Sequence, residues 1–254
     1  MMEEIGGEDS KGESGQDVNR EEAAEPLEIT ERDVAIFKLI HEQRYVVMNQ
    51  IVTAFWKCRS EDGRAAKRRV SRLVEADYLK LGAVSGREIK VLLLTEKSYG
   101  ELKSRGLDSG LSLYVPKSDY YYHFDHDLKV VNLRILFRDL GLDKWKSERL
   151  LKEKELYGKV PDAVLDIHGY QAAIEFENTV KSKERYREAF QRYRKYSSFY
   201  FVFFVMDKWG RDWIFDLDYD PQQVWFVLYR DLFEMRGETP FTNKEASFPL
   251  SRIL

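Results

Sequence analysis

The 254-residue sequence predicts a mixed α+β / α/β fold with two folded parts, and three observations support that prediction. Apolar residues recur at helical spacing through the first third of the chain. Short runs rich in β-branched and aromatic residues are more frequent in the second half. Between them, residues 109–119 contain a glycine, a proline and few periodic apolar residues, which is typical of a connector. We therefore expect a tail at residues 1–28, a first domain at 29–108 and a second domain at 120–254.

The tail and the rest of the chain differ in charge. Residues 1–28 hold ten acidic and two basic residues, so they carry −8 of a formal net charge of −3, and the remaining chain carries +5. The tail also has few residues that could fill a core, so we expect it to be disordered. A mildly basic folded part is compatible with an anionic partner such as nucleic acid.

Several classes of protein are excluded by what the sequence lacks. Cys58 is the only cysteine, which excludes an internal disulfide framework and a Cys-rich zinc site and fits a reducing compartment. The most apolar run, Phe199–Met206, is too short for a membrane helix, and the acidic start does not resemble a signal peptide. We therefore expect a cytoplasmic protein with no membrane partner. Glycine-rich phosphate loops and a Gly-x-Ser-x-Gly motif are absent, which argues against ATPase, oxidoreductase and serine hydrolase activity.

The first domain has the order of elements of a winged helix-turn-helix. Thr30 begins a capping box for the first helix, and two more helices precede two β-type runs around a glycine turn. A closing helix follows Thr95 and ends before Gly106. The predicted elements after the first helix are Asn49–Trp56, Arg64–Tyr78, Leu79–Val84, Glu88–Leu94 and a helix to Arg105. Three helices, a hairpin and a fourth helix are typical of this DNA-binding fold.

Basic residues on the third predicted helix indicate a DNA contact. Five of them fall within nine residues with no acid among them, opposite the apolar face. They are Arg64, Lys67, Arg68, Arg69 and Arg72. Arg87, at the tip of the predicted wing, is placed to touch the DNA backbone or the minor groove. The alternatives are a merely solvated helix face and a winged helix that contacts only proteins.

The second domain begins with a helix and continues with strands. His123 and His126 precede this helix, and their spacing favours a capping or interdomain role over a metal pair. The predicted elements are a helix from Leu128 to Leu140, strands at Trp145–Leu151, Ala163–Ile167 and Ala172–Phe176, a helix at Lys183–Ser197, and strands at Phe199–Met206 and Val224–Tyr229. Trp213–Leu217 is predicted as a short strand or turn, and the chain from Phe233 onward as a loose arm.

Three carboxylates mark the middle of this domain. Asp162 opens one strand, and Glu175 and Glu177 lie on one face near the end of the next, across a turn containing Gly169. If the hairpin closes, Asp162 lies across from the two glutamates. Converging like charges repel each other, and a divalent cation relieves that cost.

These residues resemble a known family. Pro161-Asp162-Ala163, Gly169 and Glu175-Phe176-Glu177 are similar to the core of the PD-(D/E)XK nuclease superfamily. Within it, the sequence most resembles the replication-relaxation proteins of plasmids and other mobile elements, which join a winged helix to such a core. Thr179, a basic helix from Lys183 and His126 stand in matching places. The resemblance implies an αβββαβ domain, and Glu177 occupies the position of the superfamily's lysine.

The resemblance also implies a chemistry. Asp162 and Glu175 would bind Mg²⁺, with Glu177 and Lys181 (or Lys183) acting in catalysis and Glu148 as a further ligand. The alternative is that Asp162 only opens a strand and the glutamates form ion pairs with the following helix. We therefore expect one of two functions. The first is binding of double-stranded DNA in plasmid or mobile-element replication or its regulation, with a homodimer as a candidate assembly. The second is a Mg²⁺-dependent endonuclease or nickase targeted by the winged helix.

Overall fold

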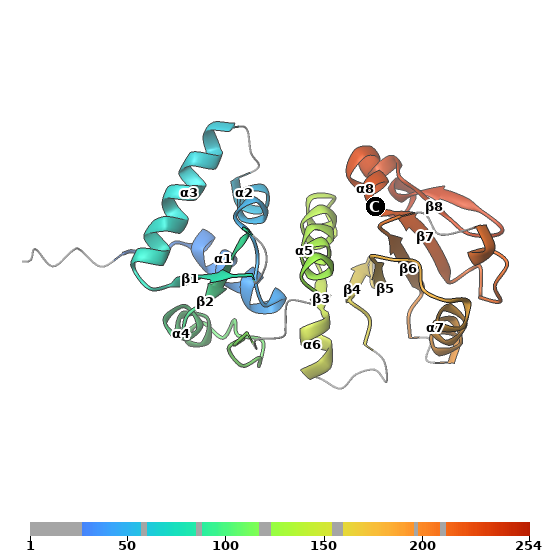
Figure 1. Cartoon of the computed structure of the whole chain (residues 1–254), viewed down its shortest axis with the longest axis horizontal. Coiled ribbons are helices and arrows are strands. Elements are labelled where there is room, and N and C mark those ends of the chain that lie inside the picture. The colour runs from blue at the N-terminus through green and yellow to red at the C-terminus, as the bar shows by residue number, and fades with distance from the viewer. Residues whose placement is uncertain are drawn as a thin grey trace, which may run out of the picture.

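A computed structural model of the chain describes residues 27–56, 60–84, 88–116, 123–153, 160–195, 198–208 and 212–254. Over these residues the fold is mixed α+β, with eight α-helices and a seven-stranded mixed sheet beside a two-stranded one. Figure 1 shows the first part, around the small sheet, and the second part, around the large sheet, on either side of a central helix. Most of the acidic tail and Arg87 lie outside the described residues. No helix in the described part of the chain is both long and apolar enough to cross a membrane.

The first part follows the predicted order of elements. Thr30 and Asp33 form the expected capping box, and a second one forms between Thr95 and Ser98. The antiparallel pair of strands begins with Leu79 opposite Leu94. The elements are α1 (Glu31–Gln43), α2 (Met48–Trp56), α3 (Ser60–Glu75), β1 (Leu79–Ala83), β2 (Lys90–Leu94) and α4 (Glu96–Ser104).

The second part is built on the seven-stranded sheet, whose strand order follows the chain from β3 to β9. Strands β5, β6 and β7 are parallel to one another, and the other neighbours are antiparallel. The helices are α5 (Phe124–Asp139), α6 (Glu148–Glu153), α7 (Lys183–Lys195) and α8 (Tyr229–Met235). The strands are β3 (Trp145–Ser147), β4 (Ala163–Ile167), β5 (Tyr170–Glu177), β6 (Phe201–Met206), β7 (Val224–Leu228), β8 (Pro240–Thr242) and β9 (Ser247–Pro249).

Two predictions for this part were wrong. The strand predicted at Trp145–Leu151 ends at Ser147, and the next residues form α6 because Glu148–Glu153 are mostly good helix formers. The chain from Phe233 onward is not a loose arm. It contains the end of α8 and the β8–β9 pair, whose three-residue strands are too short to show a period of two. For Trp213–Leu217, predicted as a short strand or turn, the turn is confirmed, since a turn of 3₁₀-helix covers Asp212–Ile214 and turn residues follow it.

The large sheet is covered on both faces. Alternate residues of β5 point to opposite faces, so Ile174 and Phe176 pack in one core with α5 while Ala173 packs in the other with α7. Glu175 and Glu177 have the same parity as Ala173 and therefore face α7. This alternation decides which helix can bind the two glutamates.

Helix α5 belongs to both parts of the molecule. Its Val131 and Ile135 are buried in the core of the first part, whereas Leu133 and Phe137 are buried in the core against the large sheet. Figure 1 shows the helix between the two sheets. The connector predicted at 109–119 therefore joins two parts that also share a helix.

Candidate nucleic-acid interface and carboxylate site

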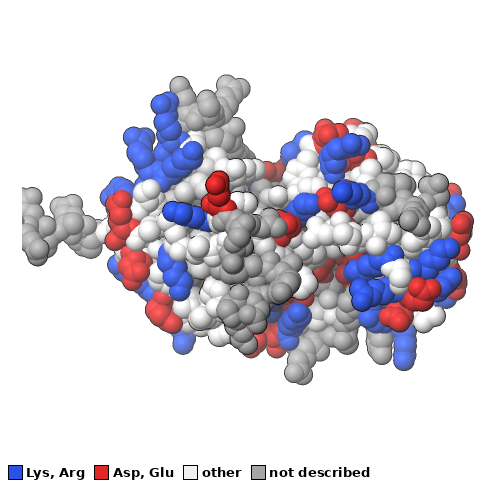
Figure 2. All heavy atoms as spheres, viewed as in Figure 1, with Lys and Arg blue, Asp and Glu red and all other residues white. Residues whose placement is uncertain are grey.

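Helix α3 carries an exposed basic stripe. Its Ala66, Val70 and Leu73 are buried against the first core. The opposite side carries four exposed cations, Arg64, Lys67, Arg68 and Arg72, which we call the α3 stripe. Among the described residues none of the four has an ion pair or a side-chain hydrogen-bond partner. Figure 2 shows Lys and Arg side chains gathered where α3 forms the edge of the molecule.

Arg69 has a different place from the other basic residues of α3. Its Nε donates to Asp33 Oδ1 at 3.0 Å, and its Nη2 bonds to Asp33 Oδ2 and to the Glu28 carbonyl. Asp33 is fully buried. Burial would raise the pKa of Asp33, but the hydrogen bonds from Arg69 and Thr30 outweigh it and the pKa is lowered. Arg69 therefore anchors α3 to α1 rather than facing solvent with the stripe.

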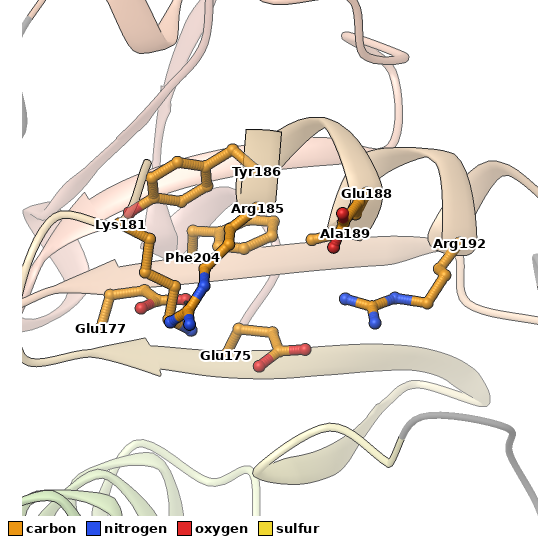
Figure 3. Close-up of a pocket in the computed structure, with 9 residues that line it drawn as sticks. All are labelled: Glu175, Glu177, Lys181, Arg185, Tyr186, Glu188, Ala189, Arg192 and Phe204. Carbon is orange, nitrogen blue, oxygen red and sulfur yellow. Dashed lines mark hydrogen bonds and ion pairs between the residues drawn. The ribbon is translucent and has the colours of Figure 1, made fainter. Parts of the chain in front are cut away.

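Glu175 and Glu177 are buried beneath α7, where each has a partner. The Tyr193 hydroxyl donates a short hydrogen bond to Glu175 Oε1, and Lys181 Nζ lies 2.6 Å from Glu177 Oε1. Burial and the charge of Glu175 raise the pKa of Tyr193 well above its ordinary value, so the phenol stays protonated and donates. Both glutamates line a cavity of about 230 Å³ between β5 and α7 (Figure 3).

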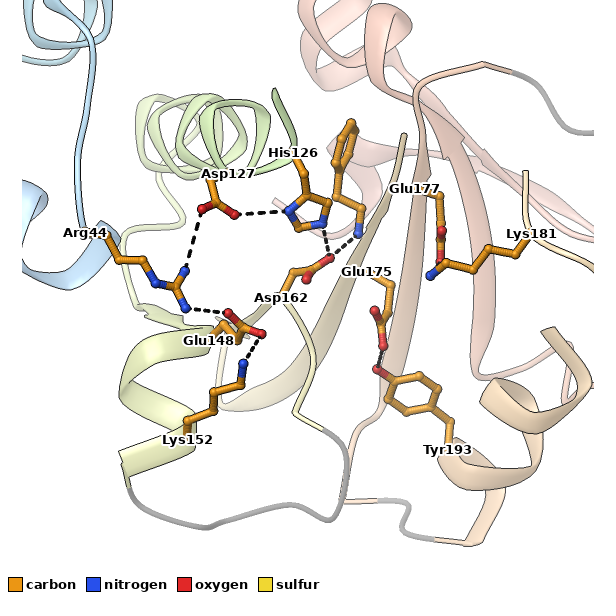
Figure 4. A network of polar contacts seen from close by, with 11 residues as sticks. Arg44, His126, Asp127, Glu148, Lys152, Asp162, Glu175, Glu177, Lys181 and Tyr193 are labelled. Carbon is orange, nitrogen blue, oxygen red and sulfur yellow. Dashed lines mark hydrogen bonds and ion pairs between the residues drawn. The ribbon is translucent and has the colours of Figure 1, made fainter. Parts of the chain in front are cut away.

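Asp162 is held at the same end of the sheet by a different set of partners. Its Oδ2 accepts hydrogen bonds from the Phe176 backbone N–H at 2.7 Å and from His126 Nε2 at 3.1 Å. His126 Nδ1 lies 3.4 Å from Asp127 Oδ1. Burial would lower the pKa of His126, but Asp127 and Asp162 outweigh it and raise the pKa to about 10. His126 is therefore a cation at neutral pH and donates to both carboxylates (Figure 4).

The network continues from Asp127 into the first part of the molecule. Arg44, the residue that follows α1, lies 4.0 Å from Asp127 Oδ2 and 2.7 Å from Glu148 Oε2. Lys152 Nζ approaches Glu148 Oε1 at 2.6 Å. Burial would raise the pKa of Glu148, but Lys152 and Arg44 lower it, so the carboxylate stays charged. Glu148, expected as a further metal ligand, instead forms ion pairs with these two cations (Figure 4).

The three carboxylates lie at one end of β4 and β5, and each has its own partner. Ala163 pairs with Ile174, so the preceding Asp162 lies across from Glu175. Asp162 is bonded to α5, Glu175 to α7, and Glu177 to the lysine just before α7. No three acidic or histidine side chains of the described residues are placed to hold a metal ion. As arranged, this donor set does not fit a Mg²⁺ site.

Sequence reasoning did not assign the residues that complete these contacts. Neither Tyr193 nor Arg44 had an expected role at the site. Lys181 lies only four residues after Glu177, so this pair is local in the chain although the two residues do not share a helix. Partners that come from distant elements leave no such signal in the chain.

Comparison with known proteins adds no relative. The described fold matches no solved structure, and the chain matches no protein-family model and no curated protein. The side chains and their contacts are therefore the grounds for inferring a function.

Proposed function

We propose that this chain binds double-stranded DNA through α3, as a winged helix fused to a PD-(D/E)XK-like domain, in the manner of the replication-relaxation proteins that its sequence resembles. On this proposal it acts in plasmid or mobile-element replication or its regulation. The observation that carries the proposal is the α3 stripe of four exposed cations without ion-pair partners. Elsewhere in the described chain, Arg44, Arg105 and Arg134 are paired with acids.

The dimensions of the stripe suit a DNA groove. Arg64 and Arg72 are eight residues apart, which corresponds to about 12 Å along a helix. The major groove of B-DNA is about 12 Å wide and admits one helix. Cations at i, i+3, i+4 and i+8 lie along one side of the helix, so they can meet phosphates along the groove.

The opposite side of α3 keeps the stripe in position. Val70 and Leu73 are buried in the first core, and Arg69 ties the helix to Asp33. A contact surface on a rigid element loses less conformational entropy on binding than one on a loop. The stripe is therefore preorganised for a long anionic partner.

Salt-dependent binding to a duplex tests the proposal. We expect Arg68→Ala and Arg72→Ala each to weaken binding and to reduce the slope of log K against log salt by about 0.9, because each removes one phosphate contact. Arg230→Ala is the matched control, since Arg230 is an exposed arginine on α8 that pairs with Asp231. Slopes equal to that of the unchanged protein in both α3 variants would show that α3 does not contact DNA.

A Mg²⁺-dependent endonuclease or nickase is the second candidate. It is favoured by the position of Asp162 across from Glu175, beside a cavity that Glu177 and Lys181 also line. A bound Mg²⁺ would polarise the phosphodiester and lower the pKa of its water. For these residues to hold it, Asp162 and Glu175 would have to give up His126 and Tyr193.

Supercoiled plasmid separates the two candidates. The protein is incubated with plasmid and Mg²⁺ or Mn²⁺, together with the variants Asp162→Asn and Asp166→Asn. Asp166 is the matched acid, since it lies on β4 away from the site and near Lys144. Nicking lost only in Asp162→Asn supports the enzyme. Plasmid that stays intact at high protein concentration excludes the endonuclease or nickase and leaves DNA binding as the proposed function.

A further inference from the structure

The cavity beneath α7 is not used by the DNA contact proposed for α3. It is about 230 Å³ in volume and lies between α7 and the end of β5. Figure 3 shows the side chains of Arg185 and Arg192 directed from α7 into the space above Glu175. A space of this size is smaller than the pockets that take drug-sized ligands, so it suits a small molecule or the end of a chain.

Two arginines supply unused hydrogen-bond donors to this cavity. Arg185 and Arg192 are seven residues apart, so they lie on one side of α7 two turns from each other. Neither has an ion pair or a side-chain hydrogen bond with a described residue. Arg192 Nε is buried and has no hydrogen-bond partner in the part of the chain that the structure describes. A buried donor without an acceptor is costly, and an anion in the cavity would remove that cost.

A tyrosine forms part of the cavity wall. The Tyr186 side chain lines the cavity and is 1% exposed, and its hydroxyl is directed toward Lys181 and away from Arg192 (Figure 3). The guanidinium donors of Arg185 and Arg192 match the oxygens of a phosphate, which accepts several hydrogen bonds and takes two from one arginine.

The acids of the cavity do not neutralise the two arginines. Glu175 is held by Tyr193 and Glu177 by Lys181. Glu188 lies between the arginines in the sequence and is exposed, and no ion pair joins it to either in the described structure. The Tyr193 phenol is a neutral donor, so Glu175 keeps its charge. The cavity therefore offers an anion two cations on its α7 side, against the two carboxylates of Glu175 and Glu188.

We propose that this cavity binds the phosphate monoester of a nucleotide, either free or at the end of a DNA strand, between Arg185 and Arg192. The proposal does not depend on DNA binding by α3, which lies in the other part of the molecule. It requires no metal ion. Arg185 and Arg192 hold the phosphate through charge-assisted hydrogen bonds.

Calorimetric titration with dAMP, with deoxyadenosine as the ligand that lacks the phosphate, tests the site. We expect dAMP to bind and deoxyadenosine not to bind. Arg185→Gln and Arg192→Gln should each weaken dAMP binding about tenfold or more, because each removes charge-assisted hydrogen bonds. Arg187→Gln is the matched control, an exposed arginine of α7 outside the cavity that pairs with Glu184, and it should change binding less than twofold.

Glu188→Gln supplies a test with the opposite sign. Removing this carboxylate should tighten dAMP binding, because it repels the phosphate. Weaker binding in Glu188→Gln, no binding of dAMP to the unchanged protein, or equal loss in the Arg187 variant would each overturn the proposal. Short oligonucleotides with a 5′-phosphate or a 5′-hydroxyl then show whether the phosphate belongs to a DNA strand end or to a free nucleotide. A preference for the phosphorylated strand assigns the site to a strand end, and binding of dAMP alone assigns it to free nucleotide.

Discussion

Helices α3 and α7 are both rich in arginine, but their cations are placed differently. On α3 the exposed cations form a stripe on an open surface, without ion-pair partners among the described residues. On α7 the cations alternate with acids, as in Glu184–Arg187, and two of them line a cavity. An open stripe suits a long anion such as a DNA backbone, whereas a lined cavity suits a small one. The number of arginines in a helix is therefore a poor guide to its ligand.

The largest effect we expect separates two neighbouring residues of α3. Arg69→Ala should lower the free energy of unfolding by about 3–5 kcal/mol, because it leaves the buried Asp33 carboxylate without its partner. Arg68→Ala, on the exposed stripe, should change it by less than about 0.5 kcal/mol. Urea denaturation of both variants measures the difference. Equal stability of the two would place Arg69 in the stripe after all.

The pH dependence of stability tests the ion pairs of His126, on α5 between the two parts of the molecule, with Asp162 and Asp127. The pKa of His126 is about 10 in the folded protein, above its unfolded value of about 6.5. Its stabilisation is therefore complete below about pH 6.5 and is lost as the pH rises toward 10. His126→Gln should remove this decline, which we expect to be on the order of a few kcal/mol. Parallel pH profiles of the two proteins would contradict the ion pairs with Asp162 and Asp127.

A smaller effect is expected on DNA affinity, where variants of α3 and α7 can be compared directly. Arg68→Ala combined with Arg72→Ala should weaken duplex binding roughly tenfold to a hundredfold at moderate salt, because two phosphate contacts are lost. Arg185→Ala combined with Arg187→Ala on α7 removes the same charge and should change duplex affinity only about threefold or less. Fluorescence anisotropy with one labelled duplex measures both. Similar losses in the two variants would mean that net charge, not the stripe, governs binding.

The smallest effect concerns the inner side of α7. Tyr193→Phe should cost about 1–2 kcal/mol in unfolding free energy, since the buried Glu175 loses the hydroxyl that donates to it. Tyr186→Phe is the matched control, because the hydroxyl of this buried tyrosine makes no hydrogen bond of standard geometry with a described residue, and it should be nearly neutral. Thermal unfolding at fixed pH compares them. A larger loss from Tyr186→Phe would show that its hydroxyl stabilises the fold.

Local patterns predicted much of the fold. The Thr30 capping box, the period of two in β5 and the glycine turn between β4 and β5 each depend on residues close together in the chain. Helix α6 and the β8–β9 pair were missed because elements of three to six residues are too short for periodicity to decide.

The candidate site was predicted less completely. The acids Asp162, Glu175 and Glu177 stand out in the sequence, and their position at one end of the sheet follows from the hairpin register. Their partners His126 and Tyr193 come from helices whose approach depends on the packed core. Burial of Asp33 likewise turns Arg69 into an anchor, although its spacing on α3 resembles that of the stripe.

The double membership of α5 limits how this protein could have been assembled. A fragment ending before residue 123 would lack Val131 and Ile135, and the first core would be left with an open apolar hollow. A fragment beginning after residue 139 would lack Leu133 and Phe137 on the other side. A chimera that joins either half to an unrelated domain would need to include α5 and a surface on the new domain that packs against it. Neither half therefore has a closed core without α5.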